Sequence, residues 1–428
     1  MNPENPEMLE LLGRLLAGNP PGAEIDWERI LPLARRHGVL PLFYWQLTRR
    51  PASGDWDVTV PGEVHELLRR NFYAAAARAM VAKRQLAQVL QALAEAGVST
   101  LVVKGAAIGA HYPDPALRSY GDLDVVVPRY QLEQAATALA KIGYRGSDQR
   151  QWRLDRHFHL SPLHSEDGRL TVEVHWQLAR PKQPWILPME ELWARAIPWS
   201  VAGQPTLRLE AVDTVLYLSL HTLVHHLARL GLRPLCDLKQ VIEDWGPPEW
   251  EALVRRAVEY RLTRAVYLML RLTEQILQVT VPAQVKERLG PGLEEPPLTE
   301  WMAGFLASDS PSAPHMPATA VRAWAQEAGA RKLLYLWRRL YPPREEMAAI
   351  YDIPPDSLRI WWAYLQRPVD LFRRYRSVLW HMVRKDPRAI AVWKQETWLR
   401  KWLGEMNATE RAYHAGDIQV GKTGHSAS

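Results

Sequence analysis

The sequence has 428 residues, with 53 Lys and Arg against 47 Asp and Glu, and a formal net charge of +6 at pH 7. This length predicts two to four domains of roughly 100–200 residues each, and a composition of 47% hydrophobic and 23% charged residues excludes global disorder. A single cysteine, Cys236, excludes a disulfide scaffold. The sequence shows no basic, apolar leader, which predicts a cytoplasmic protein. It also has no apolar run of about 18 residues, so no membrane span is predicted.

The N-terminal region, residues 1–97, is predicted to be helical. Asp26 suits the N-cap of a helix that begins at Trp27, and Gly38 and Pro41 divide this segment into two helices. Residues from about 63 to 96 contain no Gly or Pro, and their apolar residues recur at helical spacing. The sequence therefore predicts one long amphipathic helix at the end of this region.

The central part of the chain, residues 98–205, has a different pattern, because short β-branched runs alternate with helical segments. Strands are predicted at residues 98–103, 122–127, 157–163 and 170–176, and helices at residues 106–112 and 129–142. This alternation predicts an α/β unit. The expected fold class is therefore α+β and mostly helical, with the unit embedded between N- and C-terminal helical domains.

Helices are predicted to return after the α/β unit. Leucine stripes at residues 216–227 and a helical stretch at residues 250–277 indicate a helical domain at 206–306 that packs on the unit. The remaining segments are a turn-rich linker at 307–319, a helical extension at 320–414 with helices at 331–339, 343–350 and 369–385, and a disordered tail at 415–428.

Acidic residues in two predicted strands carry the strongest chemical signal. Asp122 and Asp124 are two residues apart in an apolar strand, so both carboxylates project from the same face. Two neighbouring carboxylates repel unless a cation lies between them, and oxygen ligands suit Mg²⁺. Glu173 lies in a second short strand and completes a site with three acidic ligands if the strands are neighbours.

A phosphate site is predicted beside these acids. Lys104 and Gly105 follow the first strand and precede a short helix. Glycine permits close approach of the backbone to an anion, the start of a helix offers unpaired N–H groups, and lysine adds a positive charge. The two motifs together predict a protein that binds a divalent cation and a phosphate group.

These motifs resemble the nucleotidyltransferase superfamily with the palm of the DNA polymerase β type, and within it an uncharacterised bacterial nucleotidyltransferase family. The matching residues are Lys104, Gly105, Tyr112, Arg118, Gly121 to Val125, Gly143, Tyr144 and Glu173 to Trp176. Weaker matches extend over most of residues 26–280, at Trp27, Ala34, His37, Gly38, Pro41, His221, His225 and Asp237.

The resemblance implies a palm with a mixed sheet and flanking helices at residues 98–205. It implies that Asp122, Asp124 and Glu173 bind Mg²⁺, with Mn²⁺ as the alternative ion, and are the catalytic residues. The substrate would be a nucleoside triphosphate, ATP before the others, whose nucleoside monophosphate passes to a hydroxyl acceptor as pyrophosphate leaves. A small molecule, peptide or protein is expected as acceptor rather than RNA.

The resemblance assigns nucleotide binding to Lys104, Gly105 and Arg118, where related palms carry Gly-Ser in place of the first two residues. Arg118 is equally suited to an ion pair with Asp114 or Asp122. Two other functions stay open. The chain could be a catalytically inactive nucleotide-binding or scaffold protein of a biosynthetic gene cluster, or an RNA-directed nucleotidyltransferase.

Three histidines are further candidates. His175 lies on the same strand face as Glu173 and could orient it, or it could be a hydrogen-bonded core residue. His221 and His225 are four residues apart on a predicted helix, either as polar residues at a helix contact or as residues on the acceptor side of the site. The basic, aromatic segment 371–385 could be a packed helix with a solvated face, or it could bind RNA or an anionic membrane surface.

Overall fold

The fold was analysed in a computed structural model. It describes residues 5–19, 21, 24–49, 59–118, 120–146, 157–166, 170–181, 183–226, 231–290, 337, 340–351, 353–354, 356–383, 397–404, 406 and 408–416. The chain divides into two compact units. The first comprises Met1–Ser147, Leu154–Ser308 and Leu403–Ser428, and the second comprises Asp148–Arg153 and Asp309–Trp402.

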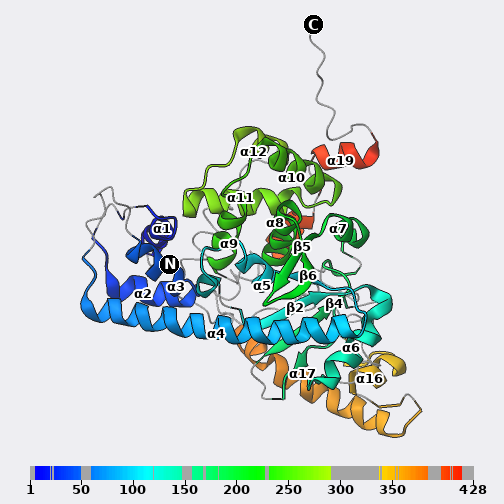
Figure 1. The fold of residues 1–428 in the computed structure, drawn as a ribbon. Coiled ribbons are helices and arrows are strands. Elements are labelled where there is room, and N and C mark those ends of the chain that lie inside the picture. The colour runs from blue at the N-terminus through cyan, green and yellow to red at the C-terminus, as the bar shows by residue number, and fades with distance from the viewer. Residues whose placement is uncertain are drawn as a thin grey trace. The chain divides into compact units, whose positions relative to one another are not determined.

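The N-terminal helices form as the sequence predicts. They are α1 (Asn5–Leu16), α2 (Trp27–Arg36), α3 (Leu40–Thr48) and α4 (Gly62–Glu95). Asp26 caps α2, because its carboxylate accepts a hydrogen bond from the backbone N–H of Arg29 at 3.2 Å. Helix α4 is the long helix of Figure 1, and it packs against α3, the later helix α6 and the sheet. It therefore links the N-terminal helices to the α/β unit.

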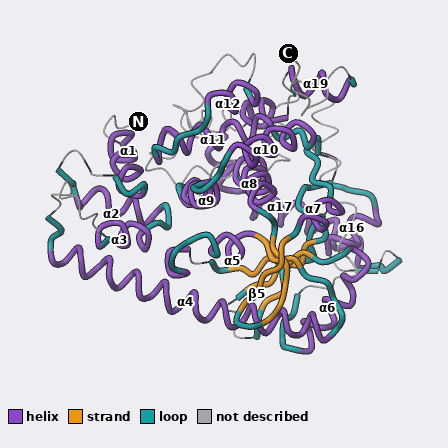
Figure 2. Tube along the Cα trace, turned by 45° about the horizontal axis from the view of Figure 1, so that its top comes forward, coloured by secondary structure: helices purple, strands orange, loops and turns teal. Residues whose placement is uncertain are grey.

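The sheet has six strands in the order β3-β4-β2-β1-β6-β5. The strands are β1 (Leu101–Val103), β2 (Asp122–Val126), β3 (Leu163–His164), β4 (Thr171–His175), β5 (Ile197–Val201) and β6 (Gln204–Arg208). β2 is parallel to β4 and β1 is parallel to β6, whereas the β1–β2, β3–β4 and β5–β6 pairs are antiparallel. The sheet is thus mixed (Figure 2).

Two features of the sheet differ from the sequence prediction. The strand predicted at 157–163 is wrong over most of its length, because this segment meets β4 through an isolated bridge at His159 and forms a regular strand only at β3. The β5–β6 hairpin was not predicted, because its two prolines obscure the strand pattern. Its turn, Ala202 and Gly203, has φ values of 48° and 85°, which allows the strands to close tightly.

Helices surround the sheet in the first unit (Figures 1 and 2). Between β1 and β5 the chain forms α5 (Lys104–Gly109), η1 (Pro115–Arg118), η2 (Arg129–Gln131), α6 (Leu132–Lys141) and α7 (Met189–Arg195). The later helices are α8 (Ala211–Ser219), η4 (Leu220–His225), α9 (Arg233–Ile242), α10 (Pro247–Glu259), α11 (Thr263–Leu277) and α12 (Ala283–Leu289). The stretch predicted at 250–277 is two helices, separated where Arg261 adopts a left-handed φ of 58°.

The C-terminal helices are α16 (Arg344–Tyr351), α17 (Arg359–Val383) and α19 (Ala408–Ala415). Helix α17 begins earlier than the predicted 369–385, because Pro368 lies inside the helix instead of before it. Helix α19 belongs to the first unit, and Glu410 accepts hydrogen bonds from the backbone N–H and the hydroxyl of Thr263 at 3.1 and 2.5 Å. This carboxylate caps the start of α11.

The predicted fold class, α+β and mostly helical with a mixed sheet between helical segments, is confirmed. The division into five segments stays a prediction. The linker 307–319, most of the helix predicted at 331–339, residues 384 and 385 and most of the predicted tail lie outside the described residues. Within the described residues, every helix is too short or too polar to cross a bilayer.

Candidate functional site

Two parallel strands bring the predicted acids together. In the register of β2 and β4, Asp124 lies opposite Glu173. Asp124 is 2% exposed, whereas Leu123 and Val125, which point to the other face, are completely buried. This burial of the opposite face fixes β2, so the carboxylate of Asp124 is held beside that of Glu173 on one face of the sheet.

Lys104 lies between these two carboxylates. Its Nζ donates a hydrogen bond to Asp124 Oδ1 at 2.6 Å and another to Glu173 Oε2 at 3.3 Å. Its backbone has a left-handed φ of 55°, a conformation that costs an L-residue other than glycine about 1–2 kcal/mol. Such strain persists where surrounding contacts hold the residue in place, and it is concentrated at functional sites.

His175 completes the cluster from the same strand as Glu173. Its Nε2 lies 3.0 Å from Asp124 Oδ1 and 3.3 Å from Glu173 Oε2, and the side chain is almost completely buried. Within the described part of the chain, Asp124, Glu173 and His175 form the group whose ligand atoms all lie within 4.8 Å of one another, and Asp122 lies outside it. Asp122 is instead the first residue of β2, where it is accessible to solvent.

The chemistry of this group fits a divalent cation. Two carboxylate oxygens and one imidazole nitrogen converge, and Asp124 Oδ2 is buried without a hydrogen-bond partner among the described residues. A buried carboxylate oxygen without a partner is costly, and a bound cation would satisfy it. Mg²⁺ usually binds through oxygen ligands alone, so the imidazole nitrogen of His175 makes this site less typical of Mg²⁺.

The charges of the site shift the pKa values of its members. The hydrogen bond from His175 and then the positive charge of Lys104 outweigh the effect of burial and hold the pKa of Glu173 well below its usual range. Burial alone would lower the pKa of Lys104, but its neighbours, including both carboxylates, raise it above the usual value. Asp122 keeps some contact with solvent, but the protein around it removes part of its hydration; this desolvation and then repulsion by Asp124 raise the pKa of Asp122.

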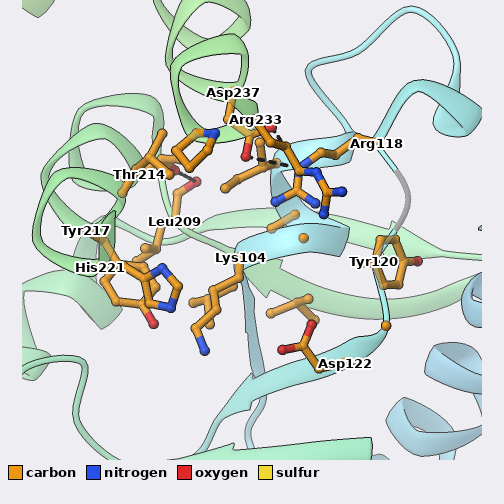
Figure 3. A pocket seen from close by; sticks show the side chains of 18 residues that line it. Lys104, Arg118, Tyr120, Asp122, Leu209, Thr214, Tyr217, His221, Arg233 and Asp237 are labelled. Carbon is orange, nitrogen blue, oxygen red and sulfur yellow. Dashed lines mark hydrogen bonds and ion pairs between the residues drawn. The ribbon is translucent and has the colours of Figure 1, made fainter. Parts of the chain in front are cut away.

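A cavity of about 260 Å³ opens beside this cluster, between β1, α5 and the helices α8, η4 and α9 (Figure 3). Its lining includes Lys104, Gly105, Arg118, Tyr120, Asp122, Tyr217, His221, Arg233 and Asp237. Gly105 leaves no room for a larger residue, because an added Cβ would lie 2.6 Å from Tyr120 Cβ. Lys104 and Gly105 of the predicted phosphate turn and Asp122 of the predicted acid pair thus line the same cavity.

Two guanidinium groups line the upper wall of this cavity in Figure 3. Arg118 Nε donates hydrogen bonds to both oxygens of Asp237 at 2.7 and 3.0 Å, and Tyr112 donates one to the same carboxylate at 2.8 Å. Arg233 donates to the backbone carbonyl of Gly38 at 3.3 Å. Arg118 thus pairs with Asp237, whereas the sequence suggested Asp114 or Asp122 as its acidic partner.

The other predicted histidines lie in an aromatic cluster. His221 lines the cavity, and its ring is 6.0 Å from that of His225, which in turn is 5.3 Å from the ring of Phe158. Burial, followed by the positive charge of Arg180, lowers the pKa of His225 to about 2, and burial also lowers the pKa of His221 well below its usual value. Both imidazoles are therefore neutral at pH 7.

The structure thus places the predicted site residues in two adjoining groups. Lys104 joins them, because it contacts Asp124 and Glu173 and also lines the cavity that holds Asp122 and Arg118. Arg233, Tyr120 and Tyr217 also line the cavity, although the sequence alone does not predict it. A single arginine before a proline at a helix start gives no signal that it faces a cavity, and the two tyrosines resemble ordinary core residues.

Comparison with known proteins identifies the family. A family model described as "Uncharacterised nucleotidyltransferase" matches residues 23–278. The chain belongs to this family. The predicted enzyme class, nucleotidyltransferase, is confirmed with it. No curated protein matches the chain.

Solved structures give weaker similarities. The antibiotic-resistance factor ANT(2″)-Ia shares 14% identity over 43% of this chain and 95% of its own, with a TM-score of 0.32. An antigenic nucleotidyltransferase-like protein from Paracoccidioides brasiliensis shares 18% identity over 43% of this chain and 91% of its own, with a TM-score of 0.30. JHP933 from Helicobacter pylori shares 13% identity over 53% of this chain and 91% of its own, with a TM-score of 0.25.

Proposed function

We propose that this nucleotidyltransferase transfers a nucleoside monophosphate from a nucleoside triphosphate, ATP first among the candidates, to a hydroxyl group of a small molecule, peptide or protein. The observation that supports it is the junction at Lys104, where the buried carboxylate of Asp124 and the partly buried carboxylate of Glu173 adjoin a cavity lined by Arg118 and Arg233. Carboxylates suit a divalent cation, and guanidinium groups suit phosphate. This combination matches the charges of a metal–nucleotide substrate.

In this proposal Asp124, Glu173 and His175 would hold the divalent cation, and Asp122, which lines the adjoining cavity, would be a further acidic ligand. A bound Mg²⁺ or Mn²⁺ would supply positive charge at the reacting phosphate. Lys104 and the two guanidinium groups neutralise the triphosphate. Gly105 lines the cavity together with Lys104 and Arg118, which places the start of α5 beside the proposed position of the phosphates.

The transfer step needs no reactant other than the nucleoside triphosphate and the acceptor hydroxyl. The acceptor oxygen forms a bond to the α-phosphorus, the bond from that phosphorus to the oxygen bridging the α- and β-phosphates breaks, and pyrophosphate leaves with the electron pair. The hydroxyl proton passes to solvent as the new bond forms. Glu173 is ionised at pH 7 because its pKa lies well below its usual range, so its catalytic role in this proposal is to hold the cation and to accept a hydrogen bond rather than to act as a strong base.

The test is pyrophosphate release with each of ATP, GTP, CTP and UTP, in Mg²⁺ or Mn²⁺, over a panel of small alcohols, peptides and proteins. We expect Asp122→Asn and Asp124→Asn each to lower the rate at least about 100-fold, and Glu133→Gln, on an exposed position of α6, to leave it unchanged. Full turnover in both aspartate variants would contradict the proposal.

The same experiment separates the alternatives. Nucleotide binding without turnover over the whole panel would favour an inactive nucleotide-binding or scaffold protein. Label transfer to RNA alone would favour an RNA-directed enzyme. In that case binding of RNA should weaken steeply with salt concentration, because phosphate contacts release counterions.

A further inference from the structure

The ammonium group of Lys104 occupies the position that a cation would take between the buried carboxylate of Asp124 and the partly buried carboxylate of Glu173. Asp124 Oδ1 and Glu173 Oε2 are each within hydrogen-bond distance of two nitrogens, Lys104 Nζ and His175 Nε2. A metal bound to these oxygens and to the imidazole would lie within a few ångströms of the ammonium. Two cations this close repel strongly in a buried site, so both cannot keep these positions.

Lys104 has a second polar environment within reach on its cavity side. Tyr217 lines the cavity, is 3% exposed, and its hydroxyl has no hydrogen-bond partner among the described residues. In the view of Figure 3 the Lys104 side chain extends between Tyr217 and Asp122. A lysine side chain has four flexible methylene groups, so its ammonium can change partners while its backbone stays fixed.

We propose that Lys104 is an internal counter-cation, which holds the carboxylate pair together before metal binds and moves to the nucleotide phosphates when a divalent cation takes its place. This inference rests on the proposed function, since it assigns the incoming cation and the phosphates to that site. It explains why a lysine, despite its left-handed backbone, stands at the turn after β1. Without metal, the site thereby avoids leaving the buried Asp124 and the partly buried Glu173 without a positive partner.

The test measures binding of Mn²⁺ alone by titration calorimetry, and binding of a non-hydrolysable ATP analogue in saturating Mn²⁺. We expect Lys104→Met to bind Mn²⁺ at least about tenfold more tightly than the wild type, because a competing charge is gone. The same variant should bind the ATP analogue about tenfold more weakly. Lys141→Met, on an exposed position of α6, is the control and should change neither affinity.

Thermal unfolding distinguishes this role from a merely structural one. Lys104→Met should lower the melting temperature without metal, and Mn²⁺ should raise it by more than in the wild type. A structural role would lower the melting temperature equally with and without Mn²⁺. Lys104→Gln keeps a hydrogen-bond donor without the charge, so it decides the question if Lys104→Met does not fold.

Three results would overturn the inference: unchanged or weaker Mn²⁺ binding by both variants, unchanged affinity for the ATP analogue, or no Mn²⁺ binding by any form of the protein. The last result would also remove the metal from the proposed function. By contrast, tighter Mn²⁺ binding in the variants together with no pyrophosphate release by the wild type would refute the proposed reaction alone. The displacement of Lys104 by a cation would then stand.

Discussion

Asp237 is the residue whose loss should most damage the cavity wall. It is completely buried, and it accepts two hydrogen bonds from Arg118 and one from Tyr112. Asp237→Ala removes the buried acidic partner of a guanidinium group. Breaking a buried ion pair in this way costs about 3–5 kcal/mol of unfolding free energy, so we expect a loss in this range. The affinity for nucleotide should fall as well, because Arg118 loses the group that orients it.

Urea unfolding of the full chain measures this effect. Lys239→Ala is a matched control on the same helix, since Lys239 forms a partly exposed ion pair with Glu243 at 3.3 Å and its loss should cost at most about 1 kcal/mol. The double variant Arg118→Met with Asp237→Leu should lose less than the sum of the single changes. Equal losses for Asp237→Ala and Lys239→Ala, or additive single changes, would refute the reasoning.

Two further predictions concern the backbone and the histidines. Gly38→Ala should weaken nucleotide binding, because the added Cβ would lie 2.0 Å from Arg233 Nη2 and displace that guanidinium group. Gly97→Ala is the control, because Gly97 has a similar positive φ and its Cβ would meet only Gln134 Nε2, at 4.0 Å. Equilibrium binding measurements should show an unchanged nucleotide affinity for this control. His225→Gln should make the unfolding free energy fall less steeply below pH 6.5, because unfolded His225 gains a proton that the folded form, with a pKa of about 2, does not take up. Urea titrations at several pH values should show a dependence of the unfolding free energy on pH that is smaller by up to about 1.4 kcal/mol per pH unit in the variant. Equal slopes for variant and wild type would contradict this prediction.

The parts of the site that the sequence predicts depend on local patterns. Alternation in a short apolar strand places Asp122 and Asp124 on one face, and the same rule places Glu173 with His175. The turn at Lys104 follows from a strand, a glycine and a short helix in succession. Each of these inferences needs only residues close in the sequence. The pairing of the two acidic strands is a separate condition that local patterns do not supply, and the structure meets it, because β2 is parallel to β4 with Asp124 opposite Glu173.

The parts that the sequence does not predict depend on contacts between distant segments. Arg118 and Asp237 are 119 positions apart, and no periodicity or spacing indicates that they meet. The proximity of Lys104 to both acids depends on the antiparallel pairing of β1 with β2, which sets Val103 opposite Asp124. Burial, strand order and side-chain direction, rather than residue type, decide these partners.

The helices outside the α/β unit contribute directly to the cavity. His37 Nδ1 accepts a hydrogen bond from the backbone N–H of Leu232 at 3.3 Å, and the Gly38 carbonyl holds the guanidinium group of Arg233. The N-terminal helices thereby fix the start of α9, where Arg233 faces the cavity. A unit limited to residues 98–205 would lack both this arginine and the residues that position it, whereas the residues of the family match, 23–278, include them all.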